Sequence, residues 1–149
     1  MRRDLVEGTN TLDTTGAAMA VLRYEFMKSG GAKMRFGGDT ALTAGVFGAG
    51  TVPTSASQLA EGSRIQVPVP TDGGSDDTIG ALKALGGPLY VKWAPSAADA
   101  AFAGAGATDQ DKARSDPTNT KHLSAGEFWP IAVPPGWWIN VVDAPSSDA

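Results

Sequence analysis

Apolar and polar residues alternate in several short runs of this chain, which is the pattern of β-strands that bury one face. In the first run, residues 18–26, every second residue from Ala20 to Phe26 is apolar and falls on one face. Five further runs also predict strands: residues 33–36, 64–69, 89–93, 128–133 and 137–142.

Glycine and proline mark the turns between these runs. The Ser-Gly-Gly of residues 29–31 predicts a hairpin between the first two runs, and the Pro-Pro-Gly of residues 134–136 predicts a tight turn between the last two. Pro68 restricts the strand at 64–69 to a sheet edge or a bulge, because proline has no N–H to donate.

Two long stretches of small residues, 40–57 and 96–119, predict surface loops rich in glycine and alanine. Within the second, Ser96 can cap a short helical turn. Residues 78–85 fit either a strand or a short helix, because their apolar residues also recur at helical spacing.

The two halves of the chain share a pattern with a period of about 60 residues. Residues 65–70 and 129–134 both form an apolar run that ends in proline, and the next apolar run also matches, which favours a strand at 78–85. We therefore predict two pseudo-repeated β units, at about 18–85 and 86–143. One such unit could not bury its apolar face alone, so the two should pack face to face.

The predicted fold is an all-β, antiparallel β-sandwich of jelly-roll type with long Gly/Ala-rich loops. We expect an N-terminal arm at residues 1–17, a single sandwich domain at 18–143 and a flexible tail at 144–149. The arm is polar and tolerates β-structure, but it has no apolar stripe of its own. We therefore expect it to lie on another surface.

Composition excludes several classes of function. The chain has 149 residues, a net charge of −4 and no cysteine, so disulfides and thiolate metal sites are excluded. The basic residues are scattered and form no stripe for a nucleic-acid backbone. No run has the length or hydrophobicity of a signal sequence or a membrane span, so we expect a soluble protein made in the cytoplasm, with no membrane partner.

No constellation of side chains predicts catalysis. His122 is the single histidine, which excludes a Ser-His-Asp triad and a histidine metal cluster, and we expect it to face solvent. Asp109 and Asp111 resemble the start of a calcium loop, but Arg114 and Thr120 stand where such a loop needs Gly and Glu.

The glycine-rich segments 45–50 and 104–106 lack the spacing of a phosphate-binding loop. Asp76 and Asp77 with Glu61 or Glu127 could form a glycosidase pair of carboxylates, but they lie in predicted turns, where acidic residues are common for backbone reasons. We expect no enzymatic activity, no metal and no cofactor.

The tryptophans are the best candidates for a binding surface, because aromatic side chains anchor protein interfaces and also bind sugars. Trp137 and Trp138 are neighbours in a predicted strand, so only one of them can face the core. We expect the other to lie at a contact between subunits, on a carbohydrate-binding face or under a loop. The apolar residues of the arm, Leu5, Val6 and Leu12, are further interface candidates.

The strand and turn patterns at residues 87–93, 123–127 and 133–139 resemble those of small β-sandwich structural proteins of tailed bacteriophages. The first half of the chain repeats the pattern from residues 35–38 to residues 67–71. Proteins of this group decorate capsids or form head spikes, fibres and collar parts.

The resemblance implies a virion structural protein, most simply a capsid decoration or head-spike protein that binds the major capsid protein or neighbouring subunits. It implies a location in the virion and a symmetric homo-oligomer, with a trimer favoured. It implies no catalytic residue. The alternative is a carbohydrate-binding or receptor-binding β-sandwich module of a fibre or tail adaptor, which would need one tryptophan presented flat among polar groups.

Overall fold

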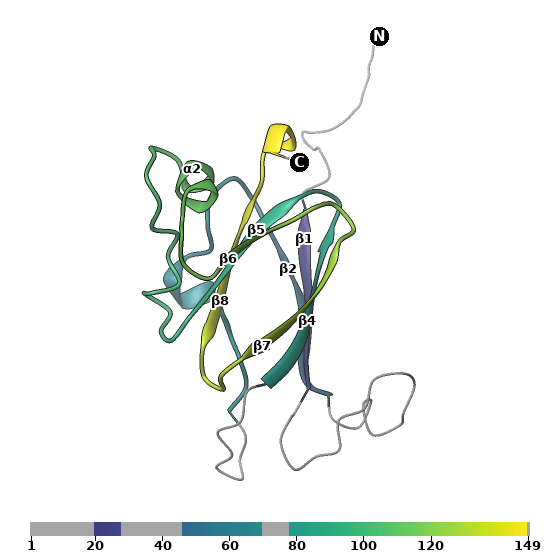
Figure 1. Ribbon diagram of the computed structural model, residues 1–149. Coiled ribbons are helices and arrows are strands. Elements are labelled where there is room, and N and C mark those ends of the chain that lie inside the picture. Colours follow the sequence, from purple (N-terminus) through teal and green to yellow (C-terminus); the bar gives the residue numbers. More distant parts are fainter. Residues whose placement is uncertain (1–19, 28–45, 70–77, 149) are drawn as a thin grey trace.

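Two antiparallel four-stranded sheets pack against each other as a β-sandwich (Figure 1). A computed structural model describes residues 20–27, 46–69 and 78–148. The strands are β1 (Val21–Met27), β2 (Val46–Pro53), β3 (Ile65–Gln66), β4 (Thr78–Leu85), β5 (Leu89–Ala94), β6 (Thr120–Leu123), β7 (Phe128–Val133) and β8 (Trp138–Asp143). The helical elements are η1 (Glu61–Ser63), α2 (Asp109–Arg114) and η2 (Ser146–Asp148).

The strand order is β2-β1-β4-β7 in one sheet and β3-β8-β5-β6 in the other. We call them the β1 sheet and the β5 sheet, each after one of its central strands. All six neighbouring pairs are antiparallel. The described chain is thus mostly β, as an all-β sandwich requires.

The core lies between the two sheets and takes its residues from the inner face of each. Leu22 and Leu82 from the β1 sheet and Leu89 and Val141 from the β5 sheet are fully buried. Burial alternates along β4, where every second residue from Thr78 onward is buried. The ambiguous segment is therefore a strand, as predicted.

The structure corrects the prediction of a long loop at residues 40–57, because β2 occupies residues 46–53. Gly50 lies opposite Tyr24 in the register of β1 and β2. A Cβ at Gly50 would come within 2.7 Å of the Tyr24 Oη, so the end of the Tyr24 side chain occupies the space beside Gly50. A side chain at position 50 would displace the Tyr24 ring, and with glycine there the apolar alternation that would have indicated a strand is lost.

The predicted loop at residues 96–119 also contains more structure than expected. Its first turn forms as predicted, with the Ser96 hydroxyl accepting a hydrogen bond from the Asp99 N–H at 3.0 Å. Further on, α2 begins after Thr108, whose side chain caps it by accepting from the Asp111 N–H at 3.0 Å. The strand β6 follows directly, from Thr120.

The turn at Pro134-Pro135-Gly136 forms, with the Trp137 N–H donating to the Pro134 carbonyl at 3.3 Å and Gly136 at a positive φ of 82°. However, β7 and β8 belong to different sheets. The turn therefore carries the chain across the sandwich and does not close a hairpin. The edge position predicted from Pro68 agrees with β3, which is the outer strand of the β5 sheet.

The residues after β8 lie against the sandwich. Ala144 is buried and donates its N–H to the Pro88 carbonyl at 3.0 Å. The Asp148 carboxylate in η2 accepts a hydrogen bond from Tyr90 Oη at 2.7 Å and pairs with Arg114 at 2.9 Å. Residues 144–148, which the sequence predicted as part of a flexible tail, thus make specific contacts. The predicted arm and the predicted strand at 33–36 lie outside the described residues.

Candidate interaction surface

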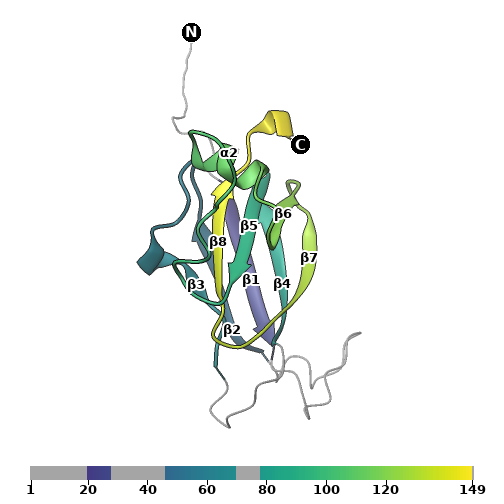
Figure 2. The same ribbon diagram turned by 60° about the vertical axis from the view of Figure 1, so that its left-hand side comes forward.

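The outer faces of the two sheets differ in what covers them. On the β5 sheet, α2 lies against β5 and β8 (Figure 2). A second apolar cluster forms beneath the segment around α2. That cluster consists of Tyr90, Phe102, Ala113, Val142 and Ala144. No described segment forms such a layer on the outer face of the β1 sheet.

The outer face of the β1 sheet is exposed and carries mostly small or apolar residues. Phe128 on β7 is 60% exposed, which is unusual for a phenylalanine. The other exposed residues that point outward from this sheet are Arg23, Ala49, Thr51, Pro53, Lys83, Pro130 and Ala132. Short side chains leave the face flat enough for another protein surface to approach closely.

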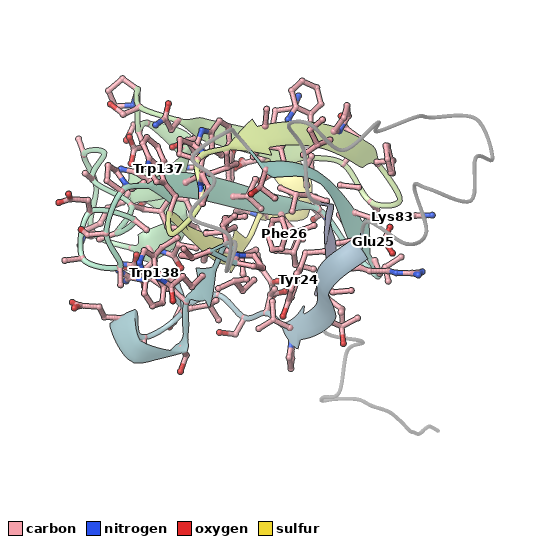
Figure 3. All side chains as sticks on the ribbon, turned by 90° about the horizontal axis from the view of Figure 1, so that it is seen from below. Tyr24, Glu25, Phe26, Lys83, Trp137 and Trp138 are labelled. Carbon is pink, nitrogen blue, oxygen red and sulfur yellow. The ribbon has the colours of Figure 1, made fainter. Side chains whose placement is uncertain are left out.

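Charged side chains lie at the centre of this face. Arg23 on β1 is directly opposite Lys83 on β4, and Glu25 follows two residues later on the same face of β1. Two like charges placed directly opposite each other destabilise a sheet slightly. Glu25, which is diagonal to Lys83 in the register, offsets part of that repulsion, and the three side chains together carry one net positive charge that attracts an acidic group from outside. Figure 3 shows Glu25 and Lys83 on the side of the molecule away from Trp137 and Trp138.

Two shallow hollows lie along the same strands. One has a volume of about 240 Å³ and is bordered by Phe128, and the other, toward β2, has a volume of about 450 Å³. Arg23, Tyr24 and Glu25 line both of them. The face is therefore a broad, shallow surface, which suits contact with a protein better than enclosure of a small molecule.

A separate cleft of about 410 Å³ opens at the edge of the sandwich, between β2 and β3. Tyr24 is the partly exposed aromatic residue of its lining, and the ring of Phe26, which is only 1% exposed, lies 5.6 Å from the ring of Tyr24. Polar groups come from its rim. The lining residues are Tyr24, Phe26, Ala49, Thr51, Val52, Ser63, Arg64, Ile65, Gln66 and Pro68.

Polar residues under the covered face of the β5 sheet bind one another. The Lys92 ammonium and the Asp116 carboxylate are 2.7 Å apart, with side chains only 6% and 1% exposed. Burial alone raises the pKa of Asp116, but hydrogen bonds from Lys92 and from the N–H groups of Ala103 and Thr118 outweigh it and hold the pKa below its usual value. The pair fixes residues 103–118 on β5.

Asn140 on β8 is fully buried, and its side chain makes four hydrogen bonds. Its amide NH₂ donates to Gln58 Oε1 and to the Ala100 carbonyl, both at 2.9 Å. Its carbonyl oxygen accepts from the N–H groups of Leu59 at 3.1 Å and Val141 at 2.8 Å. Asn140 thus joins the loop before η1 to the loop after β5.

The four tryptophans are all half-buried. Trp93, Trp129 and Trp137 pack against the central core, and the Lys121 ammonium lies 4.3 Å from the ring centre of Trp129. Trp138, opposite Gln66 in the register of β3 and β8, is not part of that core. Of the predicted interface residues, Leu5, Val6 and Leu12 lie outside the described residues.

The residues considered for metal binding are used in structural contacts. Asp109 accepts hydrogen bonds from the backbone and side chain of Gln58, and Asp111 pairs with Arg114 at 2.7 Å. Within residues 20–27, 46–69 and 78–148, no group of three or more His, Cys, Asp or Glu could hold a metal ion. None of the helices in these ranges is long and apolar enough to cross a membrane.

His122 is half-buried, whereas the sequence predicted that it faces solvent. Its ring packs edge-on against Tyr90 at 5.1 Å, and its Nε2 is buried without a hydrogen-bond partner among the described residues. Burial, together with the hydrogen bond to Asp148, raises the pKa of Tyr90 to about 12. The Tyr90 phenol is therefore neutral at physiological pH and serves as a donor to the C-terminal turn.

Sequence reasoning missed the exposed face because that face depends on strand order. Arg23, Lys83 and Phe128 come from three separate strands, and only the pairing of β1 with β4 and of β4 with β7 brings them together. The one signal in the sequence was the alternation of Arg23 and Glu25 with apolar residues, which indicates that these two charged residues share the outer face of their strand.

Comparisons of the chain with protein-family models, curated proteins and solved structures give no match.

Proposed function

We propose that this chain is a virion structural protein of a tailed bacteriophage, a capsid decoration or head-spike protein that binds the major capsid protein or neighbouring subunits. The observation that carries the proposal is the difference between the two outer faces of the sandwich. The chain covers the β5 sheet with its own α2, whereas the β1 sheet presents exposed Phe128 beside Arg23 and Lys83. A phenylalanine exposed to this extent, with short side chains around it, supports contact with another protein.

In this proposal the outer face of the β1 sheet docks on the capsid surface. Phe128 acts as the apolar anchor, and small residues around it permit close approach. Arg23 and Lys83 favour a partner surface with acidic groups, which would relieve their mutual repulsion. The function needs no catalytic group.

Replacement of Phe128 by serine tests the docking face. We expect Phe128→Ser to keep the fold and to weaken binding to particles stripped of this protein by about tenfold or more, because an aromatic anchor is lost. The measurement is co-sedimentation with such particles over a range of protein concentrations.

Val69→Ser is the matched control, because Val69 is 62% exposed but does not lie on this face. It should leave binding nearly unchanged. Equal losses for both variants, or no loss for Phe128→Ser, would contradict docking by the β1 sheet.

We also propose that the sandwich is a jelly roll. In a jelly roll of eight strands the first pairs with the eighth, the second with the seventh, the third with the sixth and the fourth with the fifth. If β1 is counted after β8, these pairs become β2–β1, β3–β8, β4–β7 and β5–β6. All four pairs are present, which supports a jelly roll in which the first strand occupies the place of the last.

The strand order also supports an origin from two pseudo-repeated units, β1 to β4 and β5 to β8. If each strand of one unit is exchanged for the strand at the same position in the other unit, the order β2-β1-β4-β7 becomes β6-β5-β8-β3, which is the β5 sheet in reverse. Each unit thus places its third strand in the sheet of the other unit.

Burial suggests how the two units align. Ile65 and Ile131 are both 8% exposed, and two residues further on Val67 and Val133 are both fully buried. A proline follows each valine. This alignment differs by two residues from the sequence comparison, which matched Pro70 with Pro134.

Carbohydrate binding is the second candidate function, and Trp138 is the observation that favours it. Trp138 stands apart from the core and opposite the amide of Gln66, so an aromatic ring and a polar group lie together. A glycan array would test this candidate. Binding that Trp138→Ala abolishes and Trp129→Phe preserves would favour a carbohydrate module, and an array without any bound glycan would contradict it.

A further inference from the structure

Among the strands that the structure describes, β2 has a neighbour on one side only, so its outer edge can receive an added strand. β2 is eight residues long and is the outermost strand of its sheet. The other three edges are less suitable. β3 has two residues, β6 has four, and Pro130 interrupts the row of N–H groups on β7. A long unprotected edge strand is a template for pairing with another chain.

The backbone groups that β2 offers can be identified. The Thr54 N–H donates to the Ala20 carbonyl at 3.0 Å. Thr54 comes directly after β2 and Ala20 directly before β1, so these two residues continue the register of the two strands as a hydrogen-bonded pair. Along a strand of an antiparallel pair, the N–H and C=O groups of successive residues point alternately toward the partner strand and away from it. The N–H groups of Ala49 and Thr51 therefore point away from β1, toward the outer edge. Pro53 is the next residue with this orientation, and it has no N–H that would need a partner.

The cleft between β2 and β3 adds a place for a side chain next to this edge. Its volume is about 410 Å³, and Tyr24 and Phe26 line it. An extended peptide paired with β2 projects every second side chain on the inner side of its own strand. An apolar side chain from that peptide would cover the exposed part of Tyr24.

We propose that the N-terminal arm of a second copy of this chain adds to β2 as a strand and places an apolar residue, Leu12, in this cleft. The arm's residues 9–15 are polar and β-tolerant, and Leu12 is the apolar residue among them. The 19 residues before Ala20 could extend about 60 Å, more than twice the length of β2 at about 3.3 Å per residue.

The position of Ala20 favours the arm of another copy over the chain's own arm. Ala20 is hydrogen-bonded to Thr54, so the chain enters β1 on the inner side of β2. Its own arm would have to cross the end of β2 and turn back to reach the outer edge. The arm of a neighbour can approach that edge directly, and repetition of this contact around an axis closes a symmetric oligomer. The inference goes beyond the docking face proposed above, since it concerns contacts between copies.

The test is the mass of the full chain in solution, measured by light scattering over a range of concentrations. Thr51→Pro removes the outward N–H and leaves the hydrogen bonds between β1 and β2 in place. We expect the native chain to be oligomeric, Thr51→Pro to associate at least tenfold more weakly, and the control Thr51→Val to behave as the native chain. Leu12→Asp in the arm should weaken association in the same way as Thr51→Pro.

Hydrogen exchange supplies the second readout. In the oligomer the N–H groups of Ala49 and Thr51 should be protected from exchange, and on dilution to the monomer they should exchange rapidly. Three results would overturn the inference. The native chain could be monomeric, or a folded Thr51→Pro variant could form the same oligomer as the native chain. The third is that both N–H groups are protected in a monomer, which would show that the chain's own arm pairs with β2. Binding of the Phe128 variants to particles is measured separately, so failure of this inference and failure of the docking face are distinguishable.

Discussion

Replacement of Asp116 by alanine is expected to lower the free energy of unfolding by about 3–5 kcal/mol, because it leaves the buried Lys92 ammonium without a partner. The same change removes the acceptor for the N–H groups of Ala103 and Thr118. Urea denaturation followed by circular dichroism measures the loss. Asp99→Ala, which removes an exposed carboxylate from the same connection, is the matched control and should change stability by about 0.5 kcal/mol or less.

The Lys92–Asp116 pair also predicts a pH dependence. Because the folded protein holds the pKa of Asp116 below its usual value of 3.8, the ionised carboxylate stabilises the fold at pH values above 3.8. This contribution is lost as the pH falls through the lower pKa of the folded state. The native chain should therefore lose more stability than Asp116→Ala between neutral pH and about pH 3. Parallel losses in the two proteins would contradict the role given to this pair.

Replacement of Asn140 by alanine should cost about 3 kcal/mol or more. The change leaves the Leu59 N–H and the Ala100 carbonyl without their partner in the interior, and each such group costs about 1–3 kcal/mol. It also opens a gap beneath the loops that Asn140 joins. The midpoint of urea denaturation measures the effect.

Gln66→Ala is the control for Asn140→Ala, because it removes an amide from an exposed position in β3. Its hydrogen bond to the Gly136 carbonyl is long, at 3.4 Å, so stability should change by about 0.5 kcal/mol or less. A loss of equal size in both variants would show that the Asn140 network adds nothing beyond an ordinary surface amide.

Sequence patterns predicted the strands that bury one apolar face, because alternation reports burial directly. They failed for β2, where the Tyr24 side chain packs over Gly50 and the inward position carries no apolar side chain. They also failed for α2, although Thr108 followed by Asp109 and Asp111 is the pattern of a capped helix start with acidic residues in its first turn. The surrounding glycine, alanine and serine residues concealed this short helix.

Long-range polar contacts were beyond the reach of sequence reasoning. Lys92 and Asp116 are separated by 24 residues, and nothing in either segment indicates that they pair. Asn140 did leave a signal, since it is the one polar residue in the apolar run from Trp137 to Val142. A lone amide in such a strand indicates a buried hydrogen-bond network, but its partners, such as Gln58, depend on the fold.

The proposed function is tested most directly by electron cryomicroscopy of intact particles from the source of this chain, at a resolution that separates strands. We predict density for the sandwich at symmetry-related positions on the particle, with the β1 sheet and Phe128 against the shell and α2 directed outward. Particles that contain no density for the sandwich, or that bind it through the α2 side, would contradict the account.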